Sequence, residues 1–243
     1  MNTGIFERTS IILSHTQLDK LKNAHILLAG LGGVGSYAAE ALARAGIGNL
    51  TFIEHDVVSS SNLNRQLVAL NSTIDQKKSQ VMRERVQDIN PDCNITIIDQ
   101  FIRPEDMDLI FNKPYDYVID AIDSLSCKVS FVRSAHEKGY KVISSMGAGG
   151  KVDPTKIKVA DVYKTSVCKL ARVMRIRLKR QRVRKGILAV YSTETPLPPL
   201  PPEPVAGEGR PRAVNGTISY LPSLFGLTAA GVAIQDIIKA TTD

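Results

Sequence analysis

A glycine-rich turn lies near the N-terminus in the pattern of a nucleotide-binding site. The apolar run Ile26–Ala29 precedes the sequence Gly-Leu-Gly-Gly-Val-Gly, and Ser36–Ala45 after it is rich in helix-forming residues. This order predicts a strand, a tight turn and a helix, whose free N–H groups attract phosphate. Without Cβ atoms, the glycines let the backbone bend sharply and approach the phosphate closely. The glycines expected to cradle it are Gly30, Gly32, Gly33 and Gly35.

An acidic residue lies where a ribose would follow the phosphates. Glu54 comes directly after the apolar run Leu50–Ile53, which we expect to form the second strand. It lies 19 residues beyond Gly35 (54 − 35), at a separation where an acid accepts hydrogen bonds from ribose hydroxyls. A glycine turn alone is weak evidence. The strand, helix and acid around it favour a nucleotide site over an ordinary structural turn.

Two cations that follow Glu54 indicate which nucleotide is bound. Arg65 belongs to the sequence Ser-Asn-Leu-Asn-Arg-Gln at 61–66, and Lys78 lies on the next expected helix. A guanidinium offers phosphate a planar fork of donors and an ammonium acts as a point charge, so together they suit a triphosphate that releases pyrophosphate. A nicotinamide-binding site does not require this pair. The alternative is that both are solvated surface charges.

A carboxylate at the end of a later strand is a candidate magnesium ligand. The sequence Tyr-Val-Ile-Asp-Ala-Ile-Asp predicts a strand over Tyr117–Asp123. Ligands of open α/β sheets bind beyond the carboxyl ends of the strands, which places Asp123 beside the glycine turn if the two strands are neighbours. Its oxygens suit Mg²⁺, whereas Asp120 points to the opposite face by strand alternation. The alternative is a helix N-cap for a segment starting near Ser124.

The positive charge of the chain is concentrated in one segment. Lys169–Lys185 carries nine Lys and Arg and no acid, so removing it changes the formal charge from +7 to +7 − 9 = −2. We expect a helix that packs through Leu170, Val173 and Ile176 and presents guanidinium groups on its other side. Such a stripe predicts salt-dependent binding to a nucleic-acid backbone rather than an ordinary solvated helix. The expected contacts are Arg175, Arg177, Lys179, Arg180, Arg182 and Arg184.

The elements that must position these residues alternate between strands and helices. Such alternation predicts an α/β fold with a mainly parallel sheet and helices on both faces. The expected elements are Ile26–Ala29, Ser36–Ala45, Leu50–Ile53, Lys77–Ile89, Asn94–Ile98, Pro104–Phe111, Tyr117–Asp123, Lys128–Lys138 and Val142–Ser145.

Length and composition indicate a single domain over residues 1–243. We divide it into a nucleotide-binding core at 18–145 and a C-terminal extension at 146–243. The extension contains the basic segment at 169–185 and a segment at 195–212 with seven of the twelve prolines, expected to be an extended or mobile loop. Ile218–Ile234 is its most apolar part, and interrupting polar and glycine residues favour a buried helix over a membrane anchor.

The cysteines argue against a zinc site or a disulfide framework. Cys93, Cys127 and Cys168 are widely separated, and a four-cysteine zinc site needs one more. We expect each to be a small buried residue. Met1–Ser10 lacks the apolar stretch of a signal peptide, so we expect a cytoplasmic protein without stable membrane association.

Together, these motifs resemble the adenylating fold of ubiquitin-activating enzymes and of their bacterial relatives that activate sulfur-carrier proteins. The resemblance rests on GLGGVGS, Glu54-His55-Asp56, SNLNRQ, Lys78 and Asp120-Ala121-Ile122-Asp123, and it spans about Leu18 to Ser145. Within that superfamily, three segments look like the family of bacterial tRNA threonylcarbamoyladenosine dehydratases. They are AIDS at 121–124, GAGGKVDPTKIKVADVYKT at 147–165 and YSTE at 191–194.

The resemblance implies a Rossmann-like adenylating fold and an ATP-dependent, AMP-forming enzyme that cyclises the threonylcarbamoyl modification of tRNA. It further implies a homodimer and a protein of a cysteine-desulfurase system as a partner, and it leaves open whether Arg8 of one subunit reaches the phosphates of the other. A monovalent cation, Na⁺ or K⁺, is an open expectation near Gly147–Gly150. The residues expected to contact ATP or its Mg²⁺ are Gly30, Gly32, Gly33, Gly35, Glu54, Asn62, Arg65, Gln66, Lys78, Asp123 and Ser124, with Arg65, Lys78 and Asp123 catalytic and Asp123 the metal ligand.

Three other functions remain as alternatives. An adenylyltransferase that activates the C-terminal glycine of a ubiquitin-like sulfur carrier would use the same ATP residues, but its relatives commonly hold zinc in two CxxC pairs. A nicotinamide oxidoreductase would leave Arg65, Lys78 and Asp123 unexplained. A non-catalytic RNA-binding module would explain only the basic segment.

Overall fold

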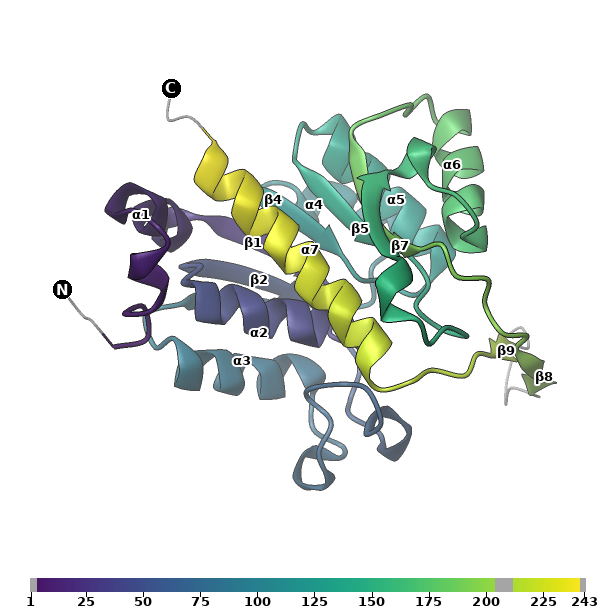
Figure 1. Cartoon of the computed structure of the whole chain (residues 1–243), viewed down its shortest axis with the longest axis horizontal. Helices are drawn as coiled ribbons and strands as arrows, with labels where there is room; N and C mark the ends of the chain where they lie inside the picture. Colours follow the sequence, from purple (N-terminus) through teal and green to yellow (C-terminus); the bar gives the residue numbers. More distant parts are fainter. Residues whose placement is uncertain (1–3, 204–211, 241–243) are drawn as a thin grey trace.

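A seven-stranded sheet forms the centre of the protein (Figure 1). The structure is a computed structural model that describes residues 4–203 and 212–240. The strand order is β3-β2-β1-β4-β5-β7-β6, and only β6 runs antiparallel to its neighbour. A mainly parallel sheet was predicted, and it is confirmed. The strands are β1 (His25–Ala29), β2 (Asn49–Ile53), β3 (Asn94–Ile98), β4 (Tyr117–Asp120), β5 (Val142–Ser145), β6 (Ile157–Asp161) and β7 (Ile187–Ser192).

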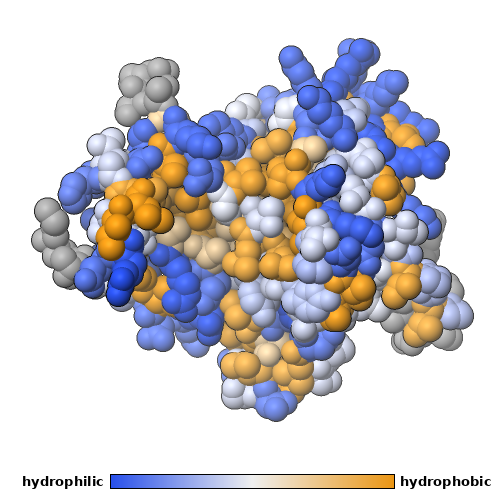
Figure 2. Space-filling view, viewed as in Figure 1, coloured by the Kyte–Doolittle hydropathy of each residue, from blue (hydrophilic) through white to orange (hydrophobic). Residues whose placement is uncertain are grey.

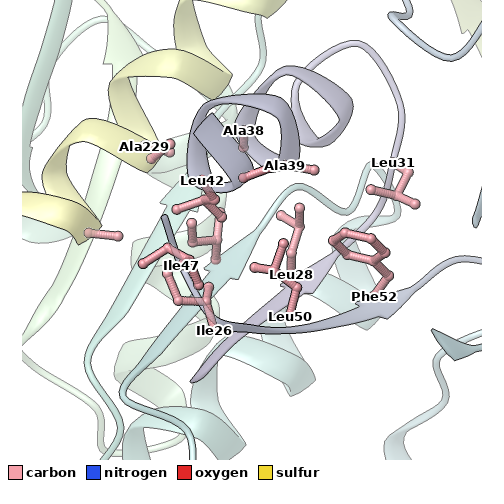
Figure 3. Packing of buried hydrophobic residues seen from close by; sticks show 14 of the residues in the cluster. Ile26, Leu28, Leu31, Ala38, Ala39, Leu42, Ile47, Leu50, Phe52 and Ala229 are labelled. Atoms are coloured by element: carbon pink, nitrogen blue, oxygen red, sulfur yellow. The ribbon is translucent and has the colours of Figure 1, made fainter. Parts of the chain in front are cut away.

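Helices cover both faces of this sheet, because consecutive residues of a strand point to opposite faces. On one face, Leu28 of β1 belongs to a hydrophobic cluster with residues of α1 (His15–Asn23), α2 (Gly35–Ala45), α3 (Lys78–Ile89) and α7 (Tyr220–Lys239). On the other face, its neighbour Leu27 belongs to a second cluster with residues of α4 (Met107–Ile110), α5 (Leu125–Glu137) and α6 (Lys169–Arg180). Figure 3 shows the first layer, where Leu42 of α2 points toward the side chains of the sheet and Ala229 of α7 lies beside α2. Short 3-10 helices lie at Thr9–Ile11, Ser60–Asn62, Asn71–Thr73, Pro104–Asp106, Pro154–Lys156 and Val162–Lys164.

Helix α7 crosses the face of α2 as a core helix (Figure 1). It is long and apolar enough to span a membrane, but half of its most apolar window is buried in the protein. The approach of the two helices requires Gly226, since a Cβ there would lie 2.1 Å from the carbonyl oxygen of Val34. The predicted buried helix is confirmed, with later boundaries than expected.

The structure corrects three predicted boundaries. Strand β4 ends at Asp120, so Asp123 lies in the following loop and the predicted strand over Tyr117–Asp123 was too long. The basic helix α6 ends at Arg180 instead of continuing to Lys185, and Arg182 has a positive φ of 65° that helix geometry excludes. Pro104–Phe111 divides into a 3-10 turn and the short helix α4.

The C-terminal extension continues the sheet of the nucleotide-binding core. Strand β7 pairs with β5, and β6 pairs with β7, so the sheet passes from the core into the extension without a break. The proline-rich segment contributes β8 (Leu200–Glu203), which pairs antiparallel with β9 (Arg212–Val214). Residues 204–211 of that predicted loop lie outside the described residues.

Candidate active site

The glycine turn between β1 and α2 is shaped by two close backbone contacts. Gly30 has φ +90°, and a Cβ there would lie 2.7 Å from the carbonyl oxygen of Ala121. A Cβ on Gly35 would lie 1.7 Å from the carbonyl oxygen of Gly30. Larger residues would therefore break the turn at both positions. Gly35 supports the turn from outside the cavity, whereas the other three predicted glycines line it.

A cavity of about 280 Å³ lies beside this turn, at the carboxyl ends of β1, β2, β3 and β4. This is the edge at which parallel α/β sheets bind ligands. The predicted site residues that line the cavity are Gly30, Gly32, Gly33, Glu54, Arg65, Gln66, Lys78, Asp123 and Ser124. Residues that are separated by up to 94 positions (124 − 30) thus surround one space.

Asn62 does not line the cavity. It is buried, and its Oδ1 accepts a hydrogen bond of 3.1 Å from the backbone N–H of Ser59. The side chain thereby closes the 3-10 turn that precedes Arg65. Contact between Asn62 and ATP stays a prediction, since the amide nitrogen of Asn62 makes only a long bond of 3.5 Å to Ser61.

Glu54 fastens the end of β2 to the glycine turn. Its Oε2 accepts a hydrogen bond of 2.7 Å from the backbone N–H of Leu31, and its Oε1 accepts from His55 and Asp56 at 2.9 and 3.0 Å. A carboxylate offers about four acceptor positions, so it keeps room for a ribose hydroxyl. Glu54 is therefore both a structural part of the site and a candidate ribose ligand.

Lys78 is a buried cation in the wall of the cavity. Only 5% of the residue is exposed, and its Nζ lies 3.0 Å from Oδ2 of Asp56, which is about half exposed. One of the three ammonium donors is thus engaged, which leaves donors for a phosphate group. Asp56 also lies 3.2 Å from Nε2 of His55.

The aspartate that ends β4 and the one in the following loop have different roles. Asp120 is fully buried, and its Oδ2 lies 2.7 Å from Nζ of Lys128 and accepts from Ser144 Oγ at 2.5 Å. Its Oδ1 accepts from the backbone N–H of Ile122 at 3.0 Å, which holds the loop that leads to Asp123. Alternation along a strand was therefore the wrong reason to prefer Asp123, because Asp123 is not in the strand.

Asp123 nevertheless has the features of a metal ligand. It is exposed, it lines the cavity, and its carboxylate makes no hydrogen bond to a described residue. Free carboxylate oxygens beside a phosphate site fit Mg²⁺.

A second group of possible metal ligands is formed by Glu54, His55 and Asp56, whose ligand atoms lie within 4.8 Å of one another. However, backbone N–H groups already bond to Glu54, and Lys78 pairs with Asp56. Ser124 occupies the N-cap position directly before α5, and its side chain makes no capping hydrogen bond.

Sequence analysis missed the segment Gln100–Ile102 and Cys127, which also line the cavity. The predicted strand Asn94–Ile98 could have indicated Gln100–Ile102. Because β3 runs parallel to β2, residues that follow β3 reach the same edge of the sheet as Glu54. Within the described part of the chain, Oε1 of Gln66 and Nε2 of Gln100 are buried without a hydrogen-bond partner.

Helix α6 turns a partly different side to the protein than expected. Ala171, Met174 and Leu178 are its buried residues. Leu170 packs against the core as predicted, but Val173 and Ile176 are 36% and 45% exposed, so the predicted packing was wrong at these two positions. Part of the predicted basic surface is also engaged within the protein. Nη1 of Arg175 donates to the carbonyl oxygens of Val162 and Thr165 at 3.3 and 3.1 Å and to Thr165 Oγ1. Four predicted contacts are exposed, namely Lys179, Arg180, Arg182 and Arg184.

One residue links the basic helix to the cavity. Nη1 of Arg177 lies 3.2 Å from Oγ of Ser126, which is in the first turn of α5, two residues after Ser124. The cationic surface therefore begins next to the cavity and is not remote from it in space.

The segment Gly147–Gly150 is held by a cation of the protein itself. Nζ of Lys151 donates to the carbonyl oxygen of Gly147 at 2.8 Å, and only 4% of Lys151 is exposed. Burial lowers the pKa of Lys151, although nearby Cys168 and Glu194 partly oppose this shift. A monovalent cation near this segment stays a prediction.

The three cysteines are free and buried, as predicted. Burial raises the pKa of Cys93 to about 11, which makes it a poor nucleophile at neutral pH. Cys127 is the one of the three that lines the cavity.

A glycine turn, a ribose-type acid, two cations and a free carboxylate at one edge of a parallel sheet define a nucleotide-binding α/β protein of the adenylating class. The chain belongs to the ThiF family, whose model matches residues 6–243. It is 35% identical over 240 residues to the tRNA threonylcarbamoyladenosine dehydratase of Bacillus subtilis, with 96% of this chain and 94% of the relative covered.

A solved structure agrees with this comparison. The crystal structure of the Escherichia coli tRNA N6-threonylcarbamoyladenosine dehydratase in complex with ATP superposes with a TM-score of 0.87 at 34% identity, covering 97% of this chain and 94% of the other. The match to the E. coli sulfur carrier protein ThiS adenylyltransferase is less complete. It has 34% identity over 159 residues, 63% of each chain.

Proposed function

We propose that this protein is an ATP-dependent dehydratase that cyclises threonylcarbamoyladenosine in tRNA. The observation that carries the proposal is the full-length similarity, in sequence and in fold, to dehydratases of that name, one of them solved with ATP. The cavity supports it independently. It combines a phosphate-binding turn with residues able to hold a ribose and a triphosphate.

The proposed reaction has two steps. The free carboxylate of the modified nucleoside attacks the α-phosphorus of ATP, and the bond to pyrophosphate breaks. The neighbouring carbamoyl group then attacks the acyl adenylate within the same molecule, and AMP leaves with the former carboxylate oxygen. The nucleoside loses one water in total. Because both reacting groups belong to one molecule, orientation supplies much of the rate of cyclisation, with effective molarities on the order of 10⁵ M or more in favourable cases.

The side chains of the cavity would act mainly through charge. Arg65 and Lys78 stabilise the negative charge that moves onto pyrophosphate, and Glu54 holds the ribose. Asp123 would hold Mg²⁺, which neutralises phosphate charge when it is bound. No thiol is needed in this scheme, in agreement with three buried cysteines.

The basic surface would hold the tRNA. Exposed cations along and after α6 suit a phosphate backbone, and Arg177 connects this surface to the first turn of α5 at the cavity. An RNA bound there would bring a nucleoside close to Asp123. Arg175 contributes less to this surface than its sequence position suggests, because its Nη1 is bonded to the protein.

We extend the proposal to assembly and location. A homodimer is consistent with the exposed apolar surface along α7 (Figure 2). A cytoplasmic location and a contribution of Arg8 to the phosphate site of the partner subunit rest on the sequence and the family resemblance. Leu227 of α7 and Val159 of β6 are exposed on the described surface. A cysteine-desulfurase system protein as a partner and Na⁺ or K⁺ near Gly147–Gly150 rest on the family resemblance alone.

Mass spectrometry of nucleosides tests the proposed function. tRNA that carries threonylcarbamoyladenosine is incubated with the protein, ATP and Mg²⁺, with a reaction lacking ATP as the control. We expect the modified nucleoside to lose the mass of one water and AMP to form in equal amount. Adenylation of a carrier-protein C-terminus without any change in the nucleoside would instead favour the sulfur-carrier adenylyltransferase.

A further inference from the structure

We propose that Asn64 is a positioning residue for Arg65. Its amide holds the guanidinium so that the free edge faces the triphosphate, and it joins this arginine to the segment before α7. The inference rests on the proposed ATP-dependent function. It assigns a role to a residue that does not line the cavity.

The contacts of Arg65 fix the orientation of its guanidinium. Nη1 donates to the carbonyl oxygen of Ser61 and to Oδ1 of Asn64, each at 2.8 Å. These two bonds use both hydrogens of Nη1. The three remaining N–H groups, on Nε and Nη2, make no hydrogen bond to a described residue, and the Nε–H with one N–H of Nη2 forms a planar edge that matches phosphate oxygens bidentately.

The stem of Arg65 lies against the glycine turn. A Cβ at Gly33 would lie 3.4 Å from Cγ of Arg65 and 3.2 Å from its carbonyl oxygen. The side chain therefore starts beside the phosphate-binding turn, and only rotation of the guanidinium remains to be fixed. Asn64 and the Ser61 carbonyl fix that rotation.

An amide suits the position of Asn64 because this side chain must accept a hydrogen bond from Arg65 and donate another to Thr217. Its Nδ2 donates to the carbonyl oxygen of Thr217 at 2.9 Å, across 153 positions of the chain. Thr217 lies between β9 and α7, where the adjacent carbonyl of Gly216 accepts from the N–H of Gly150 at 2.7 Å. A carboxylate could not donate to Thr217, and an ammonium could not accept from Arg65.

The neutrality of Asn64 also matters for phosphate binding. Arg85 provides the contrast within the same protein, since its Nε and Nη2 bond to the carboxylate of Glu40 at 2.6 and 3.1 Å. That carboxylate neutralises Arg85. Both oxygens that hold Arg65 are uncharged, so this guanidinium keeps its full charge for a ligand.

A double-mutant cycle on ATP binding tests the inference. The dissociation constant for ATP is measured by calorimetry on the full-length protein without tRNA, for the wild type, Asn64→Ala, Arg65→Ala and the double variant. We expect Asn64→Ala to weaken binding about tenfold in the wild type, which is typical for a lost bond to a charged group. In the Arg65→Ala background, we expect the same change to cost less than about twofold. The matched control is Asn112→Ala, an exposed turn residue between α4 and β4 that does not line the cavity.

Two results would overturn the inference. An equal loss from Asn64→Ala in both backgrounds would mean that Asn64 acts independently of Arg65, for example by anchoring the segment at Thr217. Wild-type affinity of Asn64→Ala would mean that Arg65 needs no positioning.

A second variant covers the case in which Asn64→Ala does not fold. Asn64→Asp keeps the acceptor but adds a charge that pairs with Arg65, so we expect it to weaken ATP binding at least as much. ATP binding as strong as in the wild type would contradict the role of a neutral acceptor. Because no tRNA is present, these results do not depend on whether the protein is a dehydratase.

Discussion

Lys128 and Asp120 form an ion pair in the interior of the protein, with 2.7 Å between Nζ and Oδ2 and at most 1% of either side chain exposed. The pair joins the second turn of α5 to the end of β4. Asp120 also bonds to the backbone of Ile122, so the pair lies directly beneath the loop that presents Asp123 to the cavity.

We expect Lys128→Met to destabilise the fold by about 3–5 kcal/mol, because it leaves Asp120 buried and charged without its partner. Chemical denaturation measures the free energy of unfolding. The control is Lys138→Met, which removes an ion pair to the exposed Asp108 and should cost less than about 1 kcal/mol. Similar losses in both variants would show that the buried pair has no special importance.

Arg65→Ala and Asp123→Ala should each reduce turnover on the order of 10²-fold or more at saturating ATP and Mg²⁺. Both side chains line the cavity, and neither supports the core, so thermal unfolding should be nearly unchanged. Turnover is followed by release of pyrophosphate with modified tRNA. Near-normal turnover of either variant would remove that residue from the proposed machinery.

The triple variant Cys93→Ser, Cys127→Ala, Cys168→Ser should still form the cyclic nucleoside, because intramolecular attack requires no thiol. Mass spectrometry of the nucleoside measures the product. All three positions are buried, so circular dichroism must first show that the variant is folded. A folded but inactive variant would support a thioester step.

Replacing Arg180, Arg182 and Arg184 with Gln should reduce the slope of log affinity for tRNA against log salt by up to about three units for duplex-like contacts. ATP affinity should change little. We leave Arg177 in place because it bonds to Ser126 beside the cavity. The charge-matched control replaces the exposed Lys22, Lys113 and Lys141 with Gln. If both triple variants lower the slope equally, the basic segment is not the specific RNA surface.

We expect His25 to make the free energy of unfolding decrease when the pH falls below 6.5. Burial lowers the pKa of His25 below its ordinary value of 6.5, with partial opposition from Asp116. Between the lowered pKa and 6.5 the native state binds fewer protons than the unfolded state, so the free energy of unfolding decreases as pH falls through this range.

The variant His25→Gln isolates this effect, since a glutamine can keep the hydrogen bond that His25 Nε2 forms with Thr51 Oγ1 at 2.8 Å. We expect the stability difference between the wild type and His25→Gln to shrink or reverse below pH 6.5. A difference that is independent of pH would mean that His25 does not titrate differently in the two states.

The sequence by itself determined the local elements and the kinds of chemistry available. Alternation of apolar runs with helix-forming segments reflects backbone periodicity, so the parallel sheet, the glycine turn before α2 and the buried helix α7 were predictable. Residue types and spacing likewise indicated Glu54, Arg65, Lys78 and Asp123, all of which line one cavity.

Only the tertiary structure decided which polar side chains remain available to a ligand. Asp120 and Asp123 are three residues apart, yet Lys128 and Ser144 engage the first and leave the second facing the cavity. Thr217, which is distant in sequence, holds Asn64, and Asn64 in turn holds Arg65. Packing of α6 on the protein likewise leaves Val173 exposed on the outer side of the helix. Periodicity records the angle between neighbouring side chains along the chain. It does not specify which partner from elsewhere in the chain satisfies each polar group, and that partner determines its chemistry.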